Sequence, residues 1–211
     1  AILSDSVVGA EATRLHDDAL KMLDRIVKEQ WLQAHGVAAI WPANTVDDDD
    51  IELYADDSRN KTIGRFQTMR QQSKKAPGVP YIALSDFIAP KGVASDFLGG
   101  FAVTTGHGVD ERVKRFEGKQ DDYSAILLKA LADRLAEAFA EKLHEVVRKE
   151  LWGYASNESL SNEELIKEAY DGIRPAPGYP ACPDHTEKPE LFRLLDGQKN
   201  TGIILTEGLA M

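Results

Sequence analysis

The sequence predicts an α+β fold, because helical and strand-like hydrophobic patterns occupy separate stretches of the chain. An amphipathic helical pattern comes first, short segments with turn residues between them follow, and a long helical pattern dominates the second half. With 211 residues, 43% of them hydrophobic, the chain is long enough to bury a substantial core. We therefore expect one α+β domain built around an antiparallel sheet.

The first half predicts one helix and three strands. Apolar residues recur every three or four positions over residues 8–36, which is typical of an amphipathic helix that stops at a glycine. The apolar run 36–41 is expected to be a short buried strand that ends at Pro42. Residues 51–54 alternate in period two, and residues 62–66 follow turn-forming residues, so the two segments are expected to pair as a hairpin.

The second half predicts two more strands and then helices. Residues 81–88 and 97–104 are strand candidates separated by turn-forming residues. Leucine, phenylalanine and valine follow helical spacing over residues 122–150, where good helix formers surround them, so a long helix is expected there. A capping box opens a shorter helix over residues 161–170, and helical character resumes at residues 190–195.

Charge and composition exclude several classes of partner. The chain has 25 basic and 35 acidic residues, and its net charge of −10 repels nucleic acid and anionic membranes. One cysteine allows no intramolecular disulfide and fits a reducing, cytoplasmic setting. No apolar run is long enough to span a membrane, and the first residues do not form a signal peptide. The first residue is not Met and residues 201–211 form an apolar, strand-like stretch, so we expect a piece of a longer protein.

A proline-rich loop over residues 174–188 is the main candidate for a binding site. Four prolines between Pro175 and Pro183 fix the backbone and lower the entropy of the unfolded loop. Gly178 permits close approach of a ligand, and Arg174 offers a planar pair of donors, which suits a carboxylate or phosphate. The alternative is a rigid surface crossing in which Arg174 pairs with a neighbouring acid.

Other candidate residues are weaker. Cys182 and His185 stand three residues apart, but two ligands do not complete a zinc site, so a buried cysteine and a hydrogen-bonding histidine are expected. The consecutive acids 47–50 lack the spacing and glycine of a calcium loop, and we expect a solvated loop. No phosphate-binding glycine motif or nucleophile elbow is present, so a nucleotide-fold dehydrogenase, a kinase and a serine hydrolase are unsupported.

The face opposite the apolar stripe of the long helix carries charged residues: Asp133, Glu137, His144 and Arg148. Asp133 and Glu137 lie one helical turn apart on this face. Such a pair can act in acid–base chemistry, neutralise a cationic ligand or simply face water. The residue types alone leave these three readings open.

The loop Arg-Pro-Ala-Pro-Gly-Tyr-Pro-Ala-Cys-Pro-Asp-His-Thr-Glu-Lys (174–188) closely resembles the signature loop of the activation domain of cobalamin-dependent methionine synthase. Further blocks that fit this family occur in the same order along the chain: 7–12, 42–44, 70–72, 86–90, 121–123, 129–141, 152–155 and 161–166. The resemblance therefore covers nearly the whole chain.

This resemblance implies a single C-shaped α+β domain, residues 1–211, with a twisted antiparallel sheet and long flanking helices. It implies binding of S-adenosylmethionine by six residues: Arg174, Ala176, Gly178, Tyr179, Ala181 and Glu137. Arg174 suits the methionyl carboxylate and the loop backbone suits adenine, while Glu137 resembles the family's acid on the long helix. Asp133 would face the cobalamin-bearing neighbour. No catalytic residue and no metal ligand is implied.

The resemblance also implies a function and partners. The family's domain presents S-adenosylmethionine for reductive methylation of inactive cob(II)alamin in methionine synthase, the 5-methyltetrahydrofolate–homocysteine S-methyltransferase. Cobalamin is carried by a neighbouring domain of the same enzyme, and flavodoxin or a diflavin reductase supplies the electron. The family's domain begins earlier and ends later than this chain, so we expect weakened or lost ligand binding and no catalytic competence of the chain alone. The alternatives are a non-catalytic docking module and a stand-alone methyltransferase, and the latter lacks acceptor-activating residues.

Overall fold

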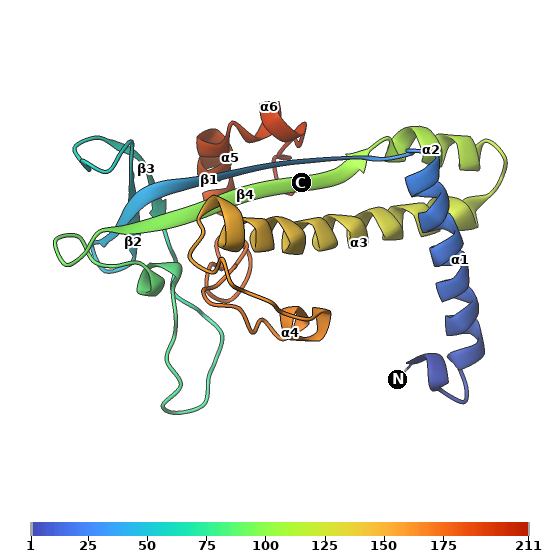
Figure 1. Ribbon diagram of the computed structural model, residues 1–211, viewed down its shortest axis with the longest axis horizontal. Helices are drawn as coiled ribbons and strands as arrows, with labels where there is room; N and C mark the ends of the chain where they lie inside the picture. Colours follow the sequence, from blue (N-terminus) through green and yellow to red (C-terminus); the bar gives the residue numbers. More distant parts are fainter. Residues whose placement is uncertain (1, 211) are drawn as a thin grey trace. The chain divides into compact units, whose positions relative to one another are not determined.

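The computed structural model describes residues 2–210 and has the α+β composition predicted from the sequence (Figure 1). Its helices are α1 (Gly9–Lys28), α2 (Val109–Glu117), α3 (Asp122–Val146), α4 (Asn162–Ile166), α5 (Lys188–Leu195) and α6 (Gly197–Thr201). Its strands are β1 (Gln33–Val46), β2 (Asp50–Tyr54), β3 (Thr62–Gln67) and β4 (Asp96–His107). Short 3₁₀ helices are η1 (Ile2–Ser4), η2 (Leu84–Phe87) and η4 (His185–Glu187), and η3 (Val147–Leu151) is a turn of π-helix.

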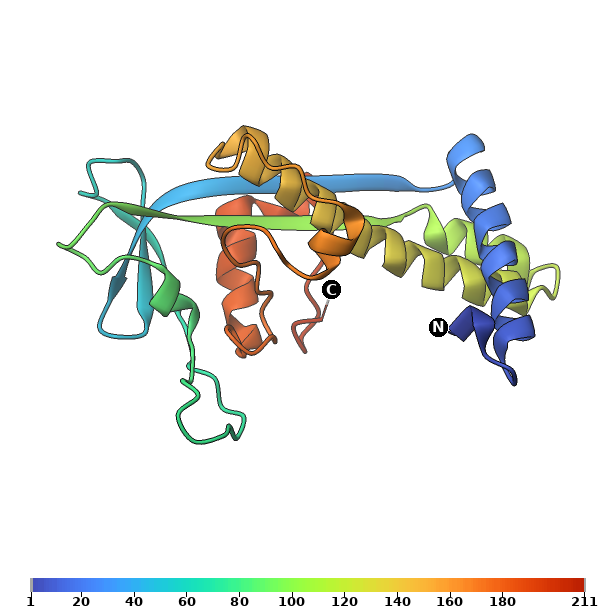
Figure 2. The same cartoon turned by 60° about the horizontal axis from the view of Figure 1, so that its bottom comes forward.

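The four strands form one antiparallel sheet in the order β3-β2-β1-β4. The long strands β1 and β4 run side by side in both views (Figure 2). The chain divides into two compact units. The first contains the residues up to His35 together with Val103–Lys142, and the second contains Gly36–Ala102 and the residues from Leu143 onward.

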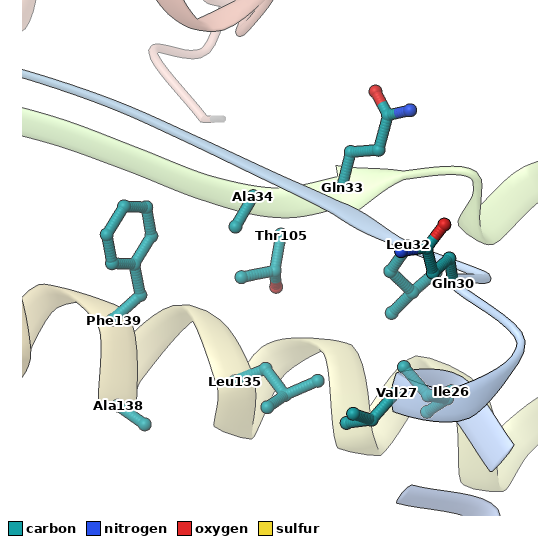
Figure 3. Close-up of a pocket in the computed structure, with 10 residues that line it drawn as sticks. All are labelled: Ile26, Val27, Gln30, Leu32, Gln33, Ala34, Thr105, Leu135, Ala138 and Phe139. Atoms are coloured by element: carbon teal, nitrogen blue, oxygen red, sulfur yellow. The ribbon is translucent and has the colours of Figure 1, made fainter. Parts of the chain in front are cut away.

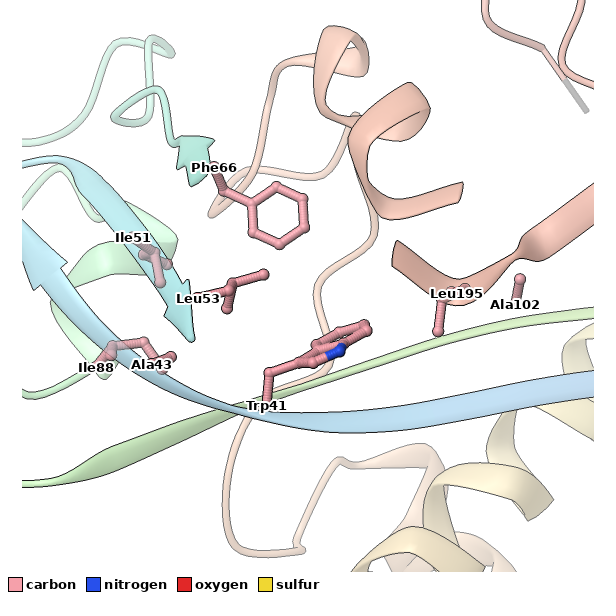
Figure 4. Packing of buried hydrophobic residues seen from close by; sticks show 8 residues of the cluster. All are labelled: Trp41, Ala43, Ile51, Leu53, Phe66, Ile88, Ala102 and Leu195. Carbon is pink, nitrogen blue, oxygen red and sulfur yellow. The ribbon is translucent and has the colours of Figure 1, made fainter. Parts of the chain in front are cut away.

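The second unit is built on the predicted hairpin. β2 pairs antiparallel with β3, with Ile51 opposite Phe66, so both apolar side chains point to the same face. Buried residues from the strands, from the end of η2 and from α5 form its core (Figure 4): Trp41, Ala43, Ile51, Leu53, Phe66, Ile88, Ala102 and Leu195. The core therefore fixes α5, which follows the proline-rich loop, against the sheet.

The first unit packs α1, α2 and α3 around a separate core. Its buried residues are Met22, Ile26, Trp31, Val113, Ala125, Leu127 and Leu128. The rings of Trp31 and Phe116 meet edge to face, with their centres 6.0 Å apart. The hydroxyl of Thr105 on β4 donates to the carbonyl oxygen of Ala132 on α3 at 2.8 Å, which ties strand to helix.

The first helix is shorter than predicted, and the strand after it is longer. α1 ends at Lys28 because Gln30 has a left-handed backbone, with φ of 51°, and the amide of Trp31 donates to the carbonyl oxygen of Ile26. This turn directs Trp31 into the core, and β1 then runs through Gly36 and Pro42. The prediction that Pro42 ends the strand is wrong. β1 pairs with β2 from Ala43 to Val46, beyond Pro42, which lacks an amide hydrogen.

The prediction of a strand at residues 81–88 is also wrong, because this segment contains the 3₁₀ helix η2. Asp86 accounts for the difference. Its carboxylate accepts a hydrogen bond from the amide of Ala83 at 2.9 Å and binds both terminal nitrogens of Arg70 at 2.6 and 2.9 Å. A side chain that caps a helical turn in this way competes with strand pairing. The prediction for residues 97–104 is confirmed by β4.

The long helix is confirmed as α3, which continues into the π-helical turn η3. The capping box is confirmed between Ser161 and Glu164, but α4 ends at Ile166 rather than near residue 170, and Glu168 then has a positive φ of 53°. Helical character at residues 190–195 is confirmed by α5. The strand-like reading of 201–211 is wrong over the part that the structure describes, where α6 ends at Thr201 and a loop follows.

The four consecutive acids form a turn rather than a fully solvated loop. Asp47 and Asp50 each bind Arg65, both at 2.6 Å, and Asp49 binds Arg70 at 2.7 Å. Within residues 2–210, no cluster of three histidine, cysteine or acidic side chains is arranged to hold a metal ion. Over the same residues, no helix combines the length and the apolar character that crossing a bilayer requires.

Candidate functional site

The proline-rich loop folds back on itself through its own backbone. The amide of Gly178 donates to the carbonyl oxygen of Cys182 at 2.7 Å, that of Tyr179 to Ala176 at 2.9 Å, and that of Cys182 to Tyr179 at 2.9 Å. Gly178 has a φ of 105°, which side chains with a Cβ rarely adopt. The loop is therefore preformed, as the prolines predicted, and these three amides hold its shape.

The candidate side chains of the loop differ in exposure. Tyr179 leaves 63% of its surface exposed although its backbone is fixed on both sides, so its ring is available to a ligand. Ala176 and Gly178 are exposed, and Ala181 is half-buried. Arg174 is half-buried and lies close enough to His144 for its charge to lower the pKa of that imidazole. The structure thus gathers five of the six predicted site residues in one loop of the second unit.

A buried polar cluster lies beside the start of this loop. Arg148, on η3, is fully buried and donates from Nε and Nη2 to the two carboxylate oxygens of Glu158 at 2.8 and 2.6 Å. Its guanidinium carbon lies 4.3 Å from the centre of the Tyr170 ring. Tyr170 precedes Arg174 by four residues. The cluster therefore fixes the chain segment that leads into Arg174.

The same cluster holds His144 in its neutral form. Nη1 of Arg148 lies 2.6 Å from Nδ1 of His144, and because a guanidinium only donates, Nδ1 must be the acceptor. Burial, together with the charges of Arg148 and Arg174, lowers the pKa of His144 from 6.5 to about 4. The ring of Tyr170 contacts this imidazole edge to face, with the ring centres 4.8 Å apart. Near neutral pH the site thus contains two guanidinium cations and one uncharged imidazole.

The far end of the loop is anchored by two buried charged residues. Glu187 on η4 accepts a hydrogen bond from the backbone of Gln67 at the end of β3, and burial raises the pKa of its carboxyl group. Lys188, the first residue of α5, donates from Nζ to the carbonyl oxygen of Leu209 at 2.8 Å. The loop is therefore held at both ends by side chains that are largely removed from water.

Glu137, the sixth predicted site residue, belongs to the first unit. Its side chain is 65% exposed and pairs with Arg134 at 2.9 Å, one turn earlier on α3. Asp133 is exposed as well. Their exposure agrees with a solvated face and equally leaves both carboxylates accessible to a ligand or a neighbouring domain.

Cys182 is buried, as predicted, and burial raises the pKa of its thiol to about 11. The thiol is therefore protonated and chemically quiet at neutral pH. Sequence analysis expected His185 to be a hydrogen-bonding residue, whereas the contact that the structure shows is between its ring and Gly178 in the loop.

An apolar cavity of about 430 Å³ lies in the first unit, between α1, α3 and the neighbouring strand ends (Figure 3). Its lining residues are Ile26, Val27, Gln30, Leu32, Gln33, Ala34, Thr105, Leu135, Ala138 and Phe139. Leu135 and Phe139 reach it from α3, and Ala34 and Thr105 from the strands. None of the six predicted site residues lines this cavity.

Sequence reasoning missed the cluster around Arg148. Helical spacing placed His144 and Arg148 on the polar face of the long helix, but both are buried because Glu158 and Tyr170 cover them. Glu158 follows Arg148 by ten residues and lies beyond the end of η3, so no single helix or strand contains both residues.

The sheet with its long helices makes this chain an α+β domain, and the preformed loop beside a buried arginine cluster makes it a candidate ligand-binding domain. A family model described as "Vitamin B12 dependent methionine synthase, activation domain" matches residues 1–211. The chain belongs to this family.

A solved structure supports the assignment. The crystal structure of the MetH reactivation domain bound to AdoHcy is 55% identical in sequence and superposes with a TM-score of 0.92. The match covers all of this chain and 64% of that chain, so this chain spans somewhat less than two thirds of the solved relative.

Proposed function

We propose that this chain is the S-adenosylmethionine-binding reactivation module of a cobalamin-dependent methionine synthase, the 5-methyltetrahydrofolate–homocysteine S-methyltransferase. The observation that carries the proposal is the preformed loop next to Arg174, in a chain 55% identical to a reactivation domain solved with AdoHcy. AdoHcy is S-adenosylmethionine without its transferable methyl group. A site that accepts one therefore has the contacts needed for most of the other.

The residues present fit this ligand chemically. The guanidinium of Arg174 is suited to the methionyl carboxylate, because a planar pair of donors matches its two oxygens. The exposed ring of Tyr179 and the open backbone at Gly178 suit a flat adenine, and peptide groups at Ala176 and Ala181 supply donors and acceptors. Glu137, which the resemblance assigns to the same ligand, keeps its carboxylate exposed on α3. All of these groups bind and orient.

The proposed reaction needs no general base or nucleophile from this chain. The sulfonium of the bound ligand supplies an already activated methyl group. What the protein contributes is position and electrostatics, which agrees with a rigid loop that begins at a cationic side chain. The methyl acceptor is cob(II)alamin on a neighbouring domain, and flavodoxin or a diflavin reductase donates the accompanying electron. A single protonated cysteine fits a reducing cytoplasm.

The proposal is tested by calorimetric titration of AdoHcy and of S-adenosylmethionine into the wild type and the Arg174→Ala variant. Loss of a charge-assisted pair is expected to weaken binding by about tenfold or more. Arg115→Ala is the matched control, because Arg115 is an exposed arginine on α2 whose partner is Glu111. A chain with the full length of the solved relative is titrated in parallel, and tighter binding to the longer chain is expected.

The competing function is a docking module without a ligand. It predicts that Arg174→Ala changes neither ligand affinity nor the rate at which S-adenosylmethionine reactivates the complete enzyme. Reactivation is followed as loss of the cob(II)alamin absorption spectrum in the presence of a reductant. Unchanged reactivation with Arg174→Ala would remove the loop from the ligand site and favour the docking role.

A further inference from the structure

We propose that His185 is a positioning residue for the ligand loop: its imidazole packs against Gly178 and fixes the backbone from Ala176 to Cys182 in the shape that binds ligand. This inference rests on the proposed function, because it concerns the same loop. It adds a residue whose side chain acts on the ligand only through Gly178.

The first observation is the contact itself. A Cβ atom added to Gly178 would lie 2.5 Å from Cε1 and 2.8 Å from Nε2 of His185, so the ring occupies the space that any side chain at Gly178 would need. Gly178 also has a left-handed backbone with φ of 105°. The left-handed conformation requires glycine here, and the ring lies in the space that the absent side chain leaves open. The imidazole thereby closes one side of the turn.

The second observation is that His185 stands on a firmly held element. It is the first residue of η4, whose start is capped by Asp184, with Oδ1 accepting from the amide of Thr186 at 2.8 Å. The next residues, Glu187 and Lys188, are buried and anchored, and α5 continues into the core of the second unit through Leu195. The ring of His185 thus connects the rigid sheet and α5 to the loop tip.

The third observation is what the loop otherwise relies on. Its internal bonds, from Gly178 to Cys182 and from Tyr179 to Ala176, close the turn, and the buried side chain of Cys182 holds one end of it. These internal bonds alone do not fix the position of Gly178 relative to the rest of the second unit. The ring of His185 supplies a contact from outside the turn, and fixing a binding loop before the ligand arrives raises affinity by lowering the ordering cost.

His185 is suited to mutation because its side chain is exposed and belongs to neither hydrophobic core. Three variants test the proposal: His185→Ala removes the ring, His185→Phe keeps a ring without nitrogen atoms, and His16→Ala removes an exposed histidine on α1 as control. AdoHcy affinity is measured by calorimetry. Hydrogen exchange of the Gly178 and Cys182 amides reports loop order without any ligand.

We expect His185→Ala to weaken AdoHcy binding by about five- to tenfold and to speed exchange at both amides. His185→Phe should restore most of the affinity and protection, since packing is the proposed role, and His16→Ala should change neither. Unchanged affinity and exchange in His185→Ala would overturn the proposal. Failure of the Phe variant to restore either property would equally overturn packing as the role. If neither this chain nor a chain with the full length of the solved relative binds AdoHcy, the proposed function fails, while the exchange comparison still decides whether His185 positions the loop.

Discussion

Lowering the pH is expected to destabilise the protein through the buried imidazole of His144. This ring is 6% exposed and accepts a hydrogen bond from Arg148, so protonation would remove the acceptor and place a third cation beside two guanidinium groups. Its pKa is about 4 in the folded protein and 6.5 in a solvated imidazole. Because the unfolded state takes up the proton first, stability falls as the pH drops below 6.5 and levels off below about 4.

The magnitude follows from these two values. The full difference of about 2.5 units corresponds to roughly 3 kcal/mol once both states are protonated. Between pH 7 and pH 5 the folded state stays mostly neutral while the unfolded state becomes charged. The expected loss over this range is about 2 kcal/mol. Glu187 acts in the opposite direction, since its raised pKa means that the folded state gains stability as its carboxyl group takes up a proton.

The assay isolates His144 by subtraction. Urea unfolding of the wild type and of His144→Gln is measured at pH 5, 6 and 7, and the difference between the two proteins removes contributions that they share, including that of Glu187. We expect this difference to change by about 2 kcal/mol between pH 7 and pH 5. The exposed His16 provides the control His16→Gln, which should follow the wild type. Parallel pH profiles for wild type and His144→Gln would refute the assignment of a neutral, buried imidazole.

Two further predictions concern buried groups of the second unit. Glu158→Gln leaves the fully buried Arg148 without its carboxylate partner and should lower the free energy of unfolding in urea by about 3–5 kcal/mol. The control Glu163→Gln changes an exposed residue and should lower it by less than about 0.5 kcal/mol. Equal effects of the two substitutions would contradict the buried ion pair. Cys182, with its thiol buried and its pKa raised to about 11, should resist iodoacetamide at pH 8 in the native protein and react in urea. Rapid alkylation of the native protein would show that the loop opens freely.

The elements that sequence analysis found correctly are those whose signals are local. The hairpin of β2 and β3 rests on alternation and turn residues, and the start of α4 on a capping box, so each is determined by a few neighbouring residues. The end of α1 was missed because helical spacing carries on through Trp31, while a left-handed residue at Gln30 turns that side chain into the core. The C-terminal end of α1 is therefore set by tertiary packing, and no local sequence pattern predicts it.

In the candidate site, too, the features with local sequence signals were predicted and those that depend on tertiary packing were not. The loop with Arg174 and Gly178 was predicted as a binding site from its prolines and from resemblance, and the internal hydrogen bonds that hold its shape join residues adjacent in sequence. The burial of Arg148 was not predicted, because its hydrogen bonds to Glu158 form only when the chain folds and no local sequence pattern links the two residues. The position of His185 against Gly178 also requires the loop to close first.

The charged face of α3 shows why burial, rather than residue type, assigns a role to each charge. Helical spacing places Glu137 and Arg148 on the same polar face, three helical turns apart. Glu137 is exposed, so its ion pair with Arg134 adds little stability and its carboxylate is available for a ligand. Arg148 is buried beneath Glu158 and Tyr170, and its charge is paired with the Glu158 carboxylate inside the protein. Of the two guanidinium groups that act on His144, Arg148 is fully buried, whereas Arg174 keeps part of its surface in solvent, which is consistent with the ligand contact proposed for Arg174.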